Sequence, residues 1–361
     1  DAISAKRVFI TSTQSLTKFA DGPLQKIEAA LGTRHAGTFT AIGAHSPREG
    51  VIAGAKAARD AGADLIVAVG GGSVIDATKA MLMCVWLGLE TPEAMEPYRE
   101  DQDRNVRTPP VPPADPVRMI SVSTTLSAAE FTPRAGVTES STHTKQAFAH
   151  RLFAPRVVIL DPSATLNTPE WLLYCTGIRA VDHAVESFCS KVANPATEPL
   201  SLQGLKLLHR SLPAIKADPA ALAPRLEAQF GMWQAISGST AGAGAGASHG
   251  IGYALGATFG IPHGHTSCIM LPAVLKWNEP VNGDRQKALS TAMGAPDRPA
   301  CELIAELVAG LDQPGNLRAA GVTRDQLGEI AKRAMHYAPV RRNPRPIKSP
   351  DDVMEILELA W

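Results

Sequence analysis

The sequence predicts an α/β domain with a parallel sheet, followed by an all-helical domain. Up to about residue 160, short apolar runs rich in β-branched residues alternate with helical patterns, which is typical of βαβ units. After Asp161 and Pro162 these runs stop, and long helical patterns follow. We therefore expect two domains, 1–162 and 163–361, with the ligand site between them.

The first domain contains strand-like runs separated by helical patterns. We expect strands over 7–13, 64–71, 117–124 and 156–160, and helices over 51–61 and 73–87. The segment 92–116 is rich in proline, which removes backbone donors. We therefore expect a surface excursion without regular structure there.

The second domain is expected to consist of helices. Apolar periodicity places them over 169–192, 198–216, 222–247, 299–311, 323–337 and 350–359. A run of small residues, STAGAGAGASHG (239–250), overlaps the third of these segments. We interpret this run as a helix that packs closely on another backbone rather than as a flexible linker.

The composition excludes some classes of partner. Equal numbers of opposite charges, 35 Lys and Arg against 35 Asp and Glu, give a formal net charge of zero, which provides no basis for binding nucleic acid or an anionic membrane. Five cysteines without a CxxC pair argue against a disulfide framework and favour a reducing cytoplasm. No apolar run is long enough to span a membrane, and the first residues lack signal-peptide features. Because the chain begins at Asp1, we expect residues to precede it.

A glycine-rich turn provides the clearest functional motif. Gly70, Gly71, Gly72 and Ser73 follow the most apolar run of the chain and open a helical pattern. Glycines allow a pyrophosphate to approach the backbone, and the helix start supplies unpaired N–H groups. The turn is not a Walker A loop, because GxxxxGK[ST] is absent. We expect phosphate binding here, the alternative being an ordinary glycine-rich turn.

The glycine-rich motif and three further motifs extend along nearly the whole chain. They are GGGSVIDATKA (70–80), STTLSAAEFT (123–132), TGIRAVDHAVES (176–187) and HGIGYALGATFGIPHG (249–264). Together they resemble the iron-containing alcohol dehydrogenase superfamily. The resemblance implies a dinucleotide-binding domain joined to a helical domain, with NADH or NADPH as cofactor, and we expect a homodimer.

The resemblance also implies a set of cofactor-binding residues. These are Gly71, Gly72, Ser73, Asp76, Thr124, Thr125 and Lys145. Alternatively, Thr124 and Thr125 are strand-end residues whose hydroxyls bond nearby backbone groups. Lys145 is alternatively a loop residue exposed to solvent. In relatives, an acidic residue after the first strand can hold the ribose hydroxyls, but this chain has Thr11, Ser12 and Thr13 there. The choice between NADH and NADPH therefore stays open.

The metal site of the family is altered in this sequence. Metal-dependent members place an Asp and a His four residues apart on one helix, and two further His fourteen residues apart. His183, His249 and His263 match, but Arg179 occupies the Asp position. A guanidinium cannot ligate a metal, and Asp182 points away from His183 on a helix and is better placed to pair with Arg179. We expect the metal to be weakened or absent; a three-histidine zinc site, or partly satisfied core histidines, are the alternatives.

Two departures from the sequence pattern of the alcohol dehydrogenases favour the maleylacetate reductase-like branch of the superfamily, which works without metal. One is Arg179, although Arg is unusual even there, and the other is TTLSAAE (124–130), which is one residue shorter than in the alcohol dehydrogenases. Tyr253 replaces a further family histidine, and it either donates a proton or only packs at the edge of the site. The catalytic residues expected are Arg179, His183, His249, Tyr253 and His263.

The expected activity is reduction of an unsaturated oxo-dicarboxylate such as maleylacetate, to 3-oxoadipate, in the degradation of aromatic compounds. One alternative is a metal-dependent alcohol or aldehyde dehydrogenase that uses the three histidines with Fe or Zn. Another is a non-catalytic nucleotide-binding protein. We expect Arg179, the histidines and Lys145 to form a locally cationic pocket for a small anionic acid.

Four residues near these motifs are expected to have structural roles. We expect His265 to be an exposed loop residue and Cys268 a buried structural one. For Glu130 and Glu186 we favour ordinary helix carboxylates over partners that orient cations.

Overall fold

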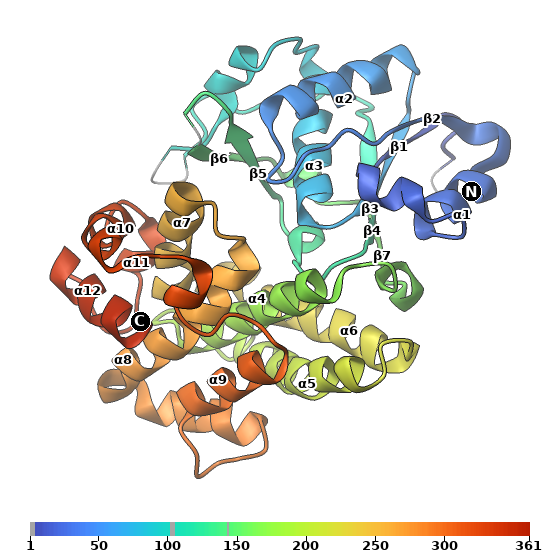
Figure 1. Cartoon of the computed structure of the whole chain (residues 1–361). Helices are drawn as coiled ribbons and strands as arrows, with labels where there is room; N and C mark the ends of the chain where they lie inside the picture. Colours follow the sequence, from blue (N-terminus) through green and yellow to red (C-terminus); the bar gives the residue numbers. More distant parts are fainter. Residues whose placement is uncertain (1–3, 102–104, 143) are drawn as a thin grey trace. The chain divides into compact units, whose positions relative to one another are not determined.

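The computed structural model describes residues 4–101, 105–142 and 144–361. It divides the chain into two compact units, Asp1–Thr168 and Pro169–Trp361 (Figure 1). The first unit carries the sheet and the second is helical. The boundary lies after Thr168, whereas the sequence predicted it after Pro162, because the segment that follows the last strand still belongs to the first unit.

A five-stranded parallel sheet forms the centre of the first unit, with strand order β2-β1-β3-β4-β7. Its strands are β1 (Val8–Thr11), β2 (His35–Phe39), β3 (Leu65–Gly70), β4 (Arg118–Ser123) and β7 (Val157–Ile159). Every residue of β3 is buried, and alternate residues enter two different apolar clusters. A strand covered on both faces has a continuous apolar sequence, which explains why β3 was predictable.

The strand β2 was missed by the sequence prediction. Its sequence, HAGTF, contains one large apolar residue and a glycine at position 37, and all five residues are only partly buried. An edge strand of this kind lacks the apolar alternation that identifies a half-buried strand.

Three α-helices accompany the sheet. They are α1 (Pro23–Leu31), α2 (Arg48–Asp60) and α3 (Gly72–Leu87), of which α2 and α3 match the predicted helices. The long helix α3 ends at Gly88, whose φ of +65° is the left-handed conformation in which glycine ends helices.

A separate antiparallel hairpin packs on α3 and was also missed. It consists of β5 (Arg134–Glu139) and β6 (Thr144–Ala149). The buried amine of Lys79, on α3, donates to the carbonyl oxygens of Ala129 at 2.5 Å and Arg134 at 2.8 Å, and to the hydroxyl of Thr132 at 3.2 Å. These bonds fasten the start of the hairpin to the helix.

The proline-rich segment 92–116 is largely irregular, as expected. Its described residues contain a 3-10 helix, Glu93–Tyr98, and an isolated bridge between Glu100 and Val106. The part of this expectation that concerns residues 102–104 lies outside the described residues.

The second unit is built from helices (Figure 1). They are α4 (Glu170–Cys189), α5 (Glu198–Ala217), α6 (Leu222–Gly238), α7 (Ala247–Phe259), α8 (His263–Ala292), α9 (Ala300–Gly310), α10 (Leu327–Ala334), α11 (Ala338–Arg341) and α12 (Pro350–Leu359). The helix α4 packs against α5, α6 and α8, so it crosses the interior of the unit. Among the described residues, no helix is both long enough and apolar enough to cross a membrane.

The predicted helix over 222–247 is confirmed as far as Gly238, and its continuation to 247 is wrong because the helix is interrupted there. The helix α6 ends at Gly238, a π-helical turn covers Ser239–Ala243, and α7 begins at Ala247. Gly242 has a φ of +106° and Gly244 a φ of +75°, which a right-handed helix cannot contain. The first part of the run of small residues thus forms a sharp connection, and its last residues begin α7. Close approach to another backbone occurs at Gly250, within the run, where a Cβ would lie 2.9 Å from the nitrogen of Val340, and at Gly204, where it would lie 2.6 Å from the nitrogen of Ala235.

Candidate active site

The glycine-rich turn lies at the carboxyl end of β3, where α3 begins. Gly71 occupies the N-cap position, and no side chain caps the helix. The first turn of α3 carries no acidic residue, so its first N–H groups and partial positive charge are available to an anion.

The glycines also allow a second loop to approach. A Cβ at Gly71 would lie 2.8 Å from Cγ2 of Thr125, and a Cβ at Gly72 would lie 2.9 Å from Oγ of Ser127. The N–H of Thr124 donates to the carbonyl oxygen of Gly70 at 3.1 Å. The structure therefore brings the predicted residues Gly71, Gly72, Thr124 and Thr125 together in one place.

Ser73 and Asp76 are both engaged by neighbouring backbone. The hydroxyl of Ser73 accepts from the N–H of His45 at 3.1 Å, which leaves the Ser73 proton available for another acceptor. Asp76 accepts from the N–H of Gly136 on β5 at 3.1 Å. Asp76 therefore fastens the hairpin, and the cofactor contact that the resemblance implies for this residue stays a prediction.

Lys145 lies exposed on β6, beside Gly136, whose Cβ position would fall 2.2 Å from Cε of the lysine. His45 is a neighbour that the sequence analysis missed. Burial and, after it, the charge of Lys145 lower the pKa of His45. No sequence pattern identifies His45, because it lies in a loop with a φ of +60°.

In the helical unit, all five predicted catalytic residues lie in one group centred on Tyr253. The ring of Tyr253 lies 6.3 Å from the ring of His249 and 6.2 Å from that of His263. The guanidinium carbon of Arg179 lies 5.7 Å from the centroid of the same ring. His183 and His249 are closer still, with Nδ1 and Nε2 3.0 Å apart. The group is drawn from α4, α7 and the first residue of α8.

Two buried carboxylates orient His249. Its Nδ1 lies 2.8 Å from a carboxylate oxygen of Glu186 and 3.3 Å from one of Asp182. Burial and Arg179 would lower the pKa of His249, but the two carboxylates outweigh them and raise it to about 9. At neutral pH, His249 is therefore a buried cation with two anionic partners.

The pKa of the neighbouring histidine, His183, shifts in the opposite direction. Burial, followed by the charges of His249 and Arg179, holds the pKa of His183 well below its usual range. His183 is therefore neutral at pH 7, and its Nδ1 accepts a hydrogen bond from the N–H at Nε2 of His249.

Arg179 pairs with Asp182, as the helical spacing predicted. Its Nη1 lies 4.0 Å from Oδ2 of Asp182 and donates to the hydroxyl of Ser267 at 3.0 Å. Burial alone would raise the pKa of Asp182, but His249 and Arg179 outweigh it and lower the pKa. Asp182 is therefore ionised and shared between two cations.

Glu186 contradicts the interpretation as an ordinary helix carboxylate. It accepts from the N–H groups of Gly246 and Ser248, each at 2.7 Å, in addition to His249. Glu130, in the first unit, is also no ordinary helix carboxylate, since it is buried and accepts from Ser123. Helical spacing alone does not reveal Glu186, because its partners depend on how the start of α7 packs on α4.

The expectation for His265 was wrong, whereas that for Cys268 agrees with the structure. His265 lies in the first turn of α8, partly buried, with its ring 5.7 Å from that of Trp171. Cys268 is fully buried, and burial raises its pKa well above the usual range. All five cysteines are free thiols.

The predicted cationic pocket also needs correction. Asp182 and Glu186 lie behind Arg179 and His249, so the charges of this cluster balance among themselves. Arg179 keeps 11% of its side chain exposed, whereas Asp182 is fully buried. The cationic group is thus the more accessible of the two.

The three histidines do not converge as one set of metal ligands. Among the described residues, the group of potential ligands whose atoms lie within 4.8 Å of one another is Asp182, Glu186 and His249. The group does not include His183 or His263. The alternative of a three-histidine site therefore lacks the required geometry in this structure.

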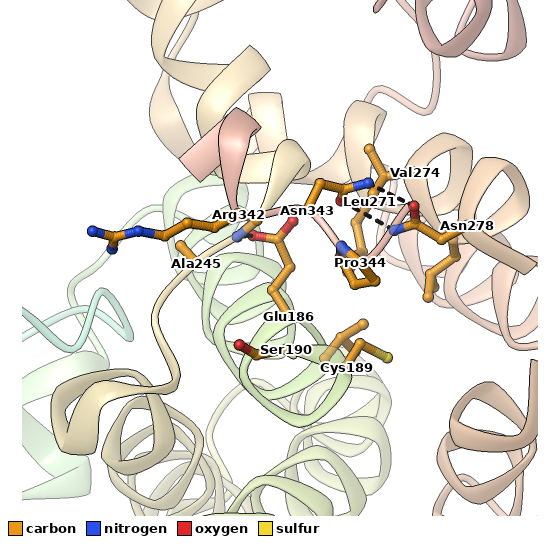
Figure 2. A pocket seen from close by; sticks show the side chains of 13 residues that line it. Glu186, Cys189, Ser190, Ala245, Leu271, Val274, Asn278, Arg342, Asn343 and Pro344 are labelled. Atoms are coloured by element: carbon orange, nitrogen blue, oxygen red, sulfur yellow. Dashed lines mark hydrogen bonds between the residues drawn. The ribbon is translucent and has the colours of Figure 1, made fainter. Parts of the chain in front are cut away.

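A small cavity lies beside Glu186 (Figure 2). Its volume is about 10 Å³, and its wall includes the reciprocal amide bonds of Asn278 and Asn343, at 3.1 and 2.7 Å. A space of this size holds about one water molecule, so it is too small for an organic acid.

Comparisons with known proteins agree with the whole architecture. Residues 1–162 match the family "Iron-containing alcohol dehydrogenase", and residues 174–361 match the C-terminal domain of the Fe-containing alcohol dehydrogenase family. A maleylacetate reductase from Sphingobium indicum is 32% identical, over 94% of this chain and 86% of that protein. A dehydrogenase from Gibberella moniliformis is also 32% identical, over 99% of this chain and 92% of that protein.

Solved structures show the same fold. The crystal structure of maleylacetate reductase from Rhizobium sp. strain MTP-10005 has a TM-score of 0.80 and 25% identity, and the match covers 100% of this chain and 91% of that one. The match extends through both units, and the α/β unit with its parallel sheet precedes the helical one, as the sequence predicted. The chain is therefore an oxidoreductase that belongs to the iron-containing alcohol dehydrogenase family.

Proposed function

We propose that this protein is an NAD(P)H-dependent, metal-independent reductase of an unsaturated oxo-dicarboxylate such as maleylacetate, which it converts to 3-oxoadipate in the degradation of aromatic compounds. The observation that carries the proposal is Arg179, which stands where metal-dependent relatives have a ligand Asp and whose side chain is held by Ser267 and Asp182. The similarity to the maleylacetate reductase of Sphingobium indicum supports the same branch.

The donor set argues against a divalent metal. Both oxygens of Glu186 already accept hydrogen bonds, and Oδ2 of Asp182 accepts from Ser248 at 2.8 Å and Ser267 at 2.6 Å. Both ring nitrogens of His249 are bonded to protein groups, Glu186 and His183, and Arg179 would repel an ion beside it. These residues do not fit the metal of the family, and the proposed reaction uses none.

The cofactor residues fit a dinucleotide. The uncapped start of α3 and the glycines at positions 71 and 72 suit a pyrophosphate, with Ser73, Thr124, Thr125 and Lys145 beside it. When bound, NAD(P)H supplies the hydride. The proposal includes a cytoplasmic location and a homodimer. Size-exclusion chromatography with light scattering tests the homodimer.

The substrate explains why a guanidinium can replace a metal. A simple aldehyde needs a Lewis acid to polarise its oxygen, whereas the double bond of maleylacetate is conjugated to a keto group. Hydride adds to the carbon β to that group, and the electron pair moves to the keto oxygen. Arg179 and His183 bind and polarise the substrate, so that the resulting enolate is stabilised. His249, whose two ring nitrogens are bonded to Glu186 and His183, contributes its positive charge through His183. Arg179 also suits a carboxylate, which it can bind through two parallel hydrogen bonds.

A proton on the neighbouring carbon completes the reduction. We assign its donation to His263 or Tyr253, which lie side by side in the cluster. Tyr253 has the cationic neighbour that a phenol donor requires, because Arg179 lies over its ring.

The test is NADH and NADPH oxidation with maleylacetate by protein from which metals have been removed with a chelator. We expect full activity without metal, and a loss of about 10²-fold to 10³-fold in kcat/KM in Arg179→Met, since a charged contact to substrate is removed. Arg179→Lys keeps the charge and should lose less. Activity with maleylacetate that requires added Fe or Zn would contradict metal independence, and no activity beyond the substrate-free rate would contradict the substrate.

A further inference from the structure

The guanidinium of Arg179 is anchored at one end. Nη1 donates to Oγ of Ser267 at 3.0 Å, and the same nitrogen lies 4.0 Å from Oδ2 of Asp182, beyond hydrogen-bond distance. Among the described residues, Arg179 forms its hydrogen bond through Nη1. Nε and Nη2 therefore remain as a second, unused edge of the planar group.

The hydrogen bonds of Ser267 have a fixed direction. A serine hydroxyl carries one proton, and that of Ser267 is donated to Oδ2 of Asp182 at 2.6 Å. Only the lone pairs of Oγ are left, and these face Nη1 of Arg179. Since Ser267 is fully buried, water does not compete for these bonds.

The hydrogen-bonded link between Asp182 and Arg179 thus runs through Ser267, in addition to their direct charge attraction across 4.0 Å. Its Oδ2 also accepts from Ser248 at 2.8 Å and lies 3.3 Å from Nδ1 of His249. A direct, bidentate ion pair with Asp182 would occupy two nitrogens of the guanidinium, whereas the link through Ser267 occupies one.

We propose that Ser267 is a positioning residue that determines specificity, because it holds Arg179 by Nη1 and thereby presents the edge formed by Nε and Nη2 to a carboxylate of the substrate. This inference rests on the proposed function, in which Arg179 binds a carboxylate, and it names the residue that makes the contact selective. Ser267 itself touches no substrate.

Ser248 provides a matched control. Ser248→Ala and Ser267→Ala each remove one buried hydroxyl that donates to the same oxygen of Asp182, but only Ser267 contacts Arg179. Ser267→Thr restores a hydroxyl at the critical position. Urea unfolding of the variants shows whether their folding is comparable.

The probe is adipate, a saturated dicarboxylate that cannot be reduced, titrated by calorimetry into the full-length protein with NAD+ present. We expect Ser267→Ala to weaken adipate binding about tenfold, Ser248→Ala to change it less than about twofold, and Ser267→Thr to recover most of the loss. In assays with maleylacetate, Ser267→Ala should raise KM more than it lowers kcat.

Equal weakening by Ser267→Ala and Ser248→Ala would overturn the inference, because the effect would then arise from Asp182 alone. An unchanged adipate affinity in Ser267→Ala would overturn it as well. If adipate binding depends on Ser267 but maleylacetate is not reduced, the positioning role stands and the proposed substrate fails. If Arg179→Met leaves adipate binding unchanged, the carboxylate contact in the proposed function fails, and the role of Ser267 fails with it.

Discussion

Lys79 in the α/β unit and His249 in the helical unit are both buried basic groups, yet their pKa values move in opposite directions. Burial lowers the pKa of Lys79 to about 8, and Asp76 and Glu130 offset only part of that effect. The pKa of His249 rises to about 9, because Asp182 and Glu186 outweigh burial. Lys79 bonds neutral oxygens, whereas His249 bonds carboxylates.

The acidic partners differ in the same way. Burial raises the pKa of Glu130, which favours its neutral form beside Lys79, whereas Asp182 has a lowered pKa and stays charged. The surroundings of Lys79 thus reduce the buried charge, while the cluster around His249 retains charges of both signs. Retained charge in a partly open cluster is expected of a site that handles a charged substrate.

The largest expected difference is in the free energy of unfolding lost when each of two buried carboxylates is replaced by an amide. Glu186→Gln replaces an oxygen that accepts from backbone N–H groups and His249, so we expect a loss of about 3 kcal/mol in the free energy of unfolding. Glu130→Gln retains an acceptor for Ser123 and should cost about 1 kcal/mol or less. Urea unfolding measures both variants, and equal losses would show that the two units treat buried charge alike.

The second prediction concerns the pH dependence contributed by His249. Because its folded pKa is about 9 and its ordinary value 6.5, the folded state binds the extra proton in this window. Its contribution to stability is complete below pH 6.5 and is lost as pH rises through 9. We expect wild-type protein to lose about 2 kcal/mol more than His249→Asn between about pH 7 and pH 9. A parallel pH dependence in the two proteins would refute the raised pKa, and His265→Asn serves as control.

The third prediction concerns the smallest expected effect, a pH dependence of stability opposite in sign to that of His249. Lys79 has a folded pKa of about 8 against an ordinary 10.5, so the unfolded state binds more protons between these values. The contribution of Lys79 therefore becomes less unfavourable as pH rises. We expect wild-type protein to gain between about 1 and 2 kcal/mol relative to Lys79→Met from about pH 7.5 to about pH 9.5. The exposed Lys56, changed to Met, should show no such gain.

The sequence predicted those parts of the molecule that local patterns determine. The strand β3 is apolar throughout because both of its faces are covered, and Arg179 pairs with Asp182 because positions three apart share a helix face. The glycine turn was predictable for the same reason, since its conformation depends on a few adjacent residues.

Other features depend on packing between distant segments. Glu186 bonds backbone groups 60 and 62 residues further along the chain, and Ser267 is 88 residues from Arg179. No spacing rule identifies such partners. The helix α8 was missed because Pro272 and Pro280 lie inside it, and proline in a sequence normally indicates that a helix ends.

The replacement of a ligand carboxylate by Arg179 has a consequence for how the proposed enzyme becomes active. A metalloenzyme must acquire the correct ion from a cell in which tighter-binding ions compete for the same ligands. The guanidinium of Arg179 is part of the polypeptide and is already held by Ser267 in the folded chain. Folding alone would thus supply the positive charge, so starvation for iron or zinc would leave this activity intact while it inactivates metal-dependent members of the family.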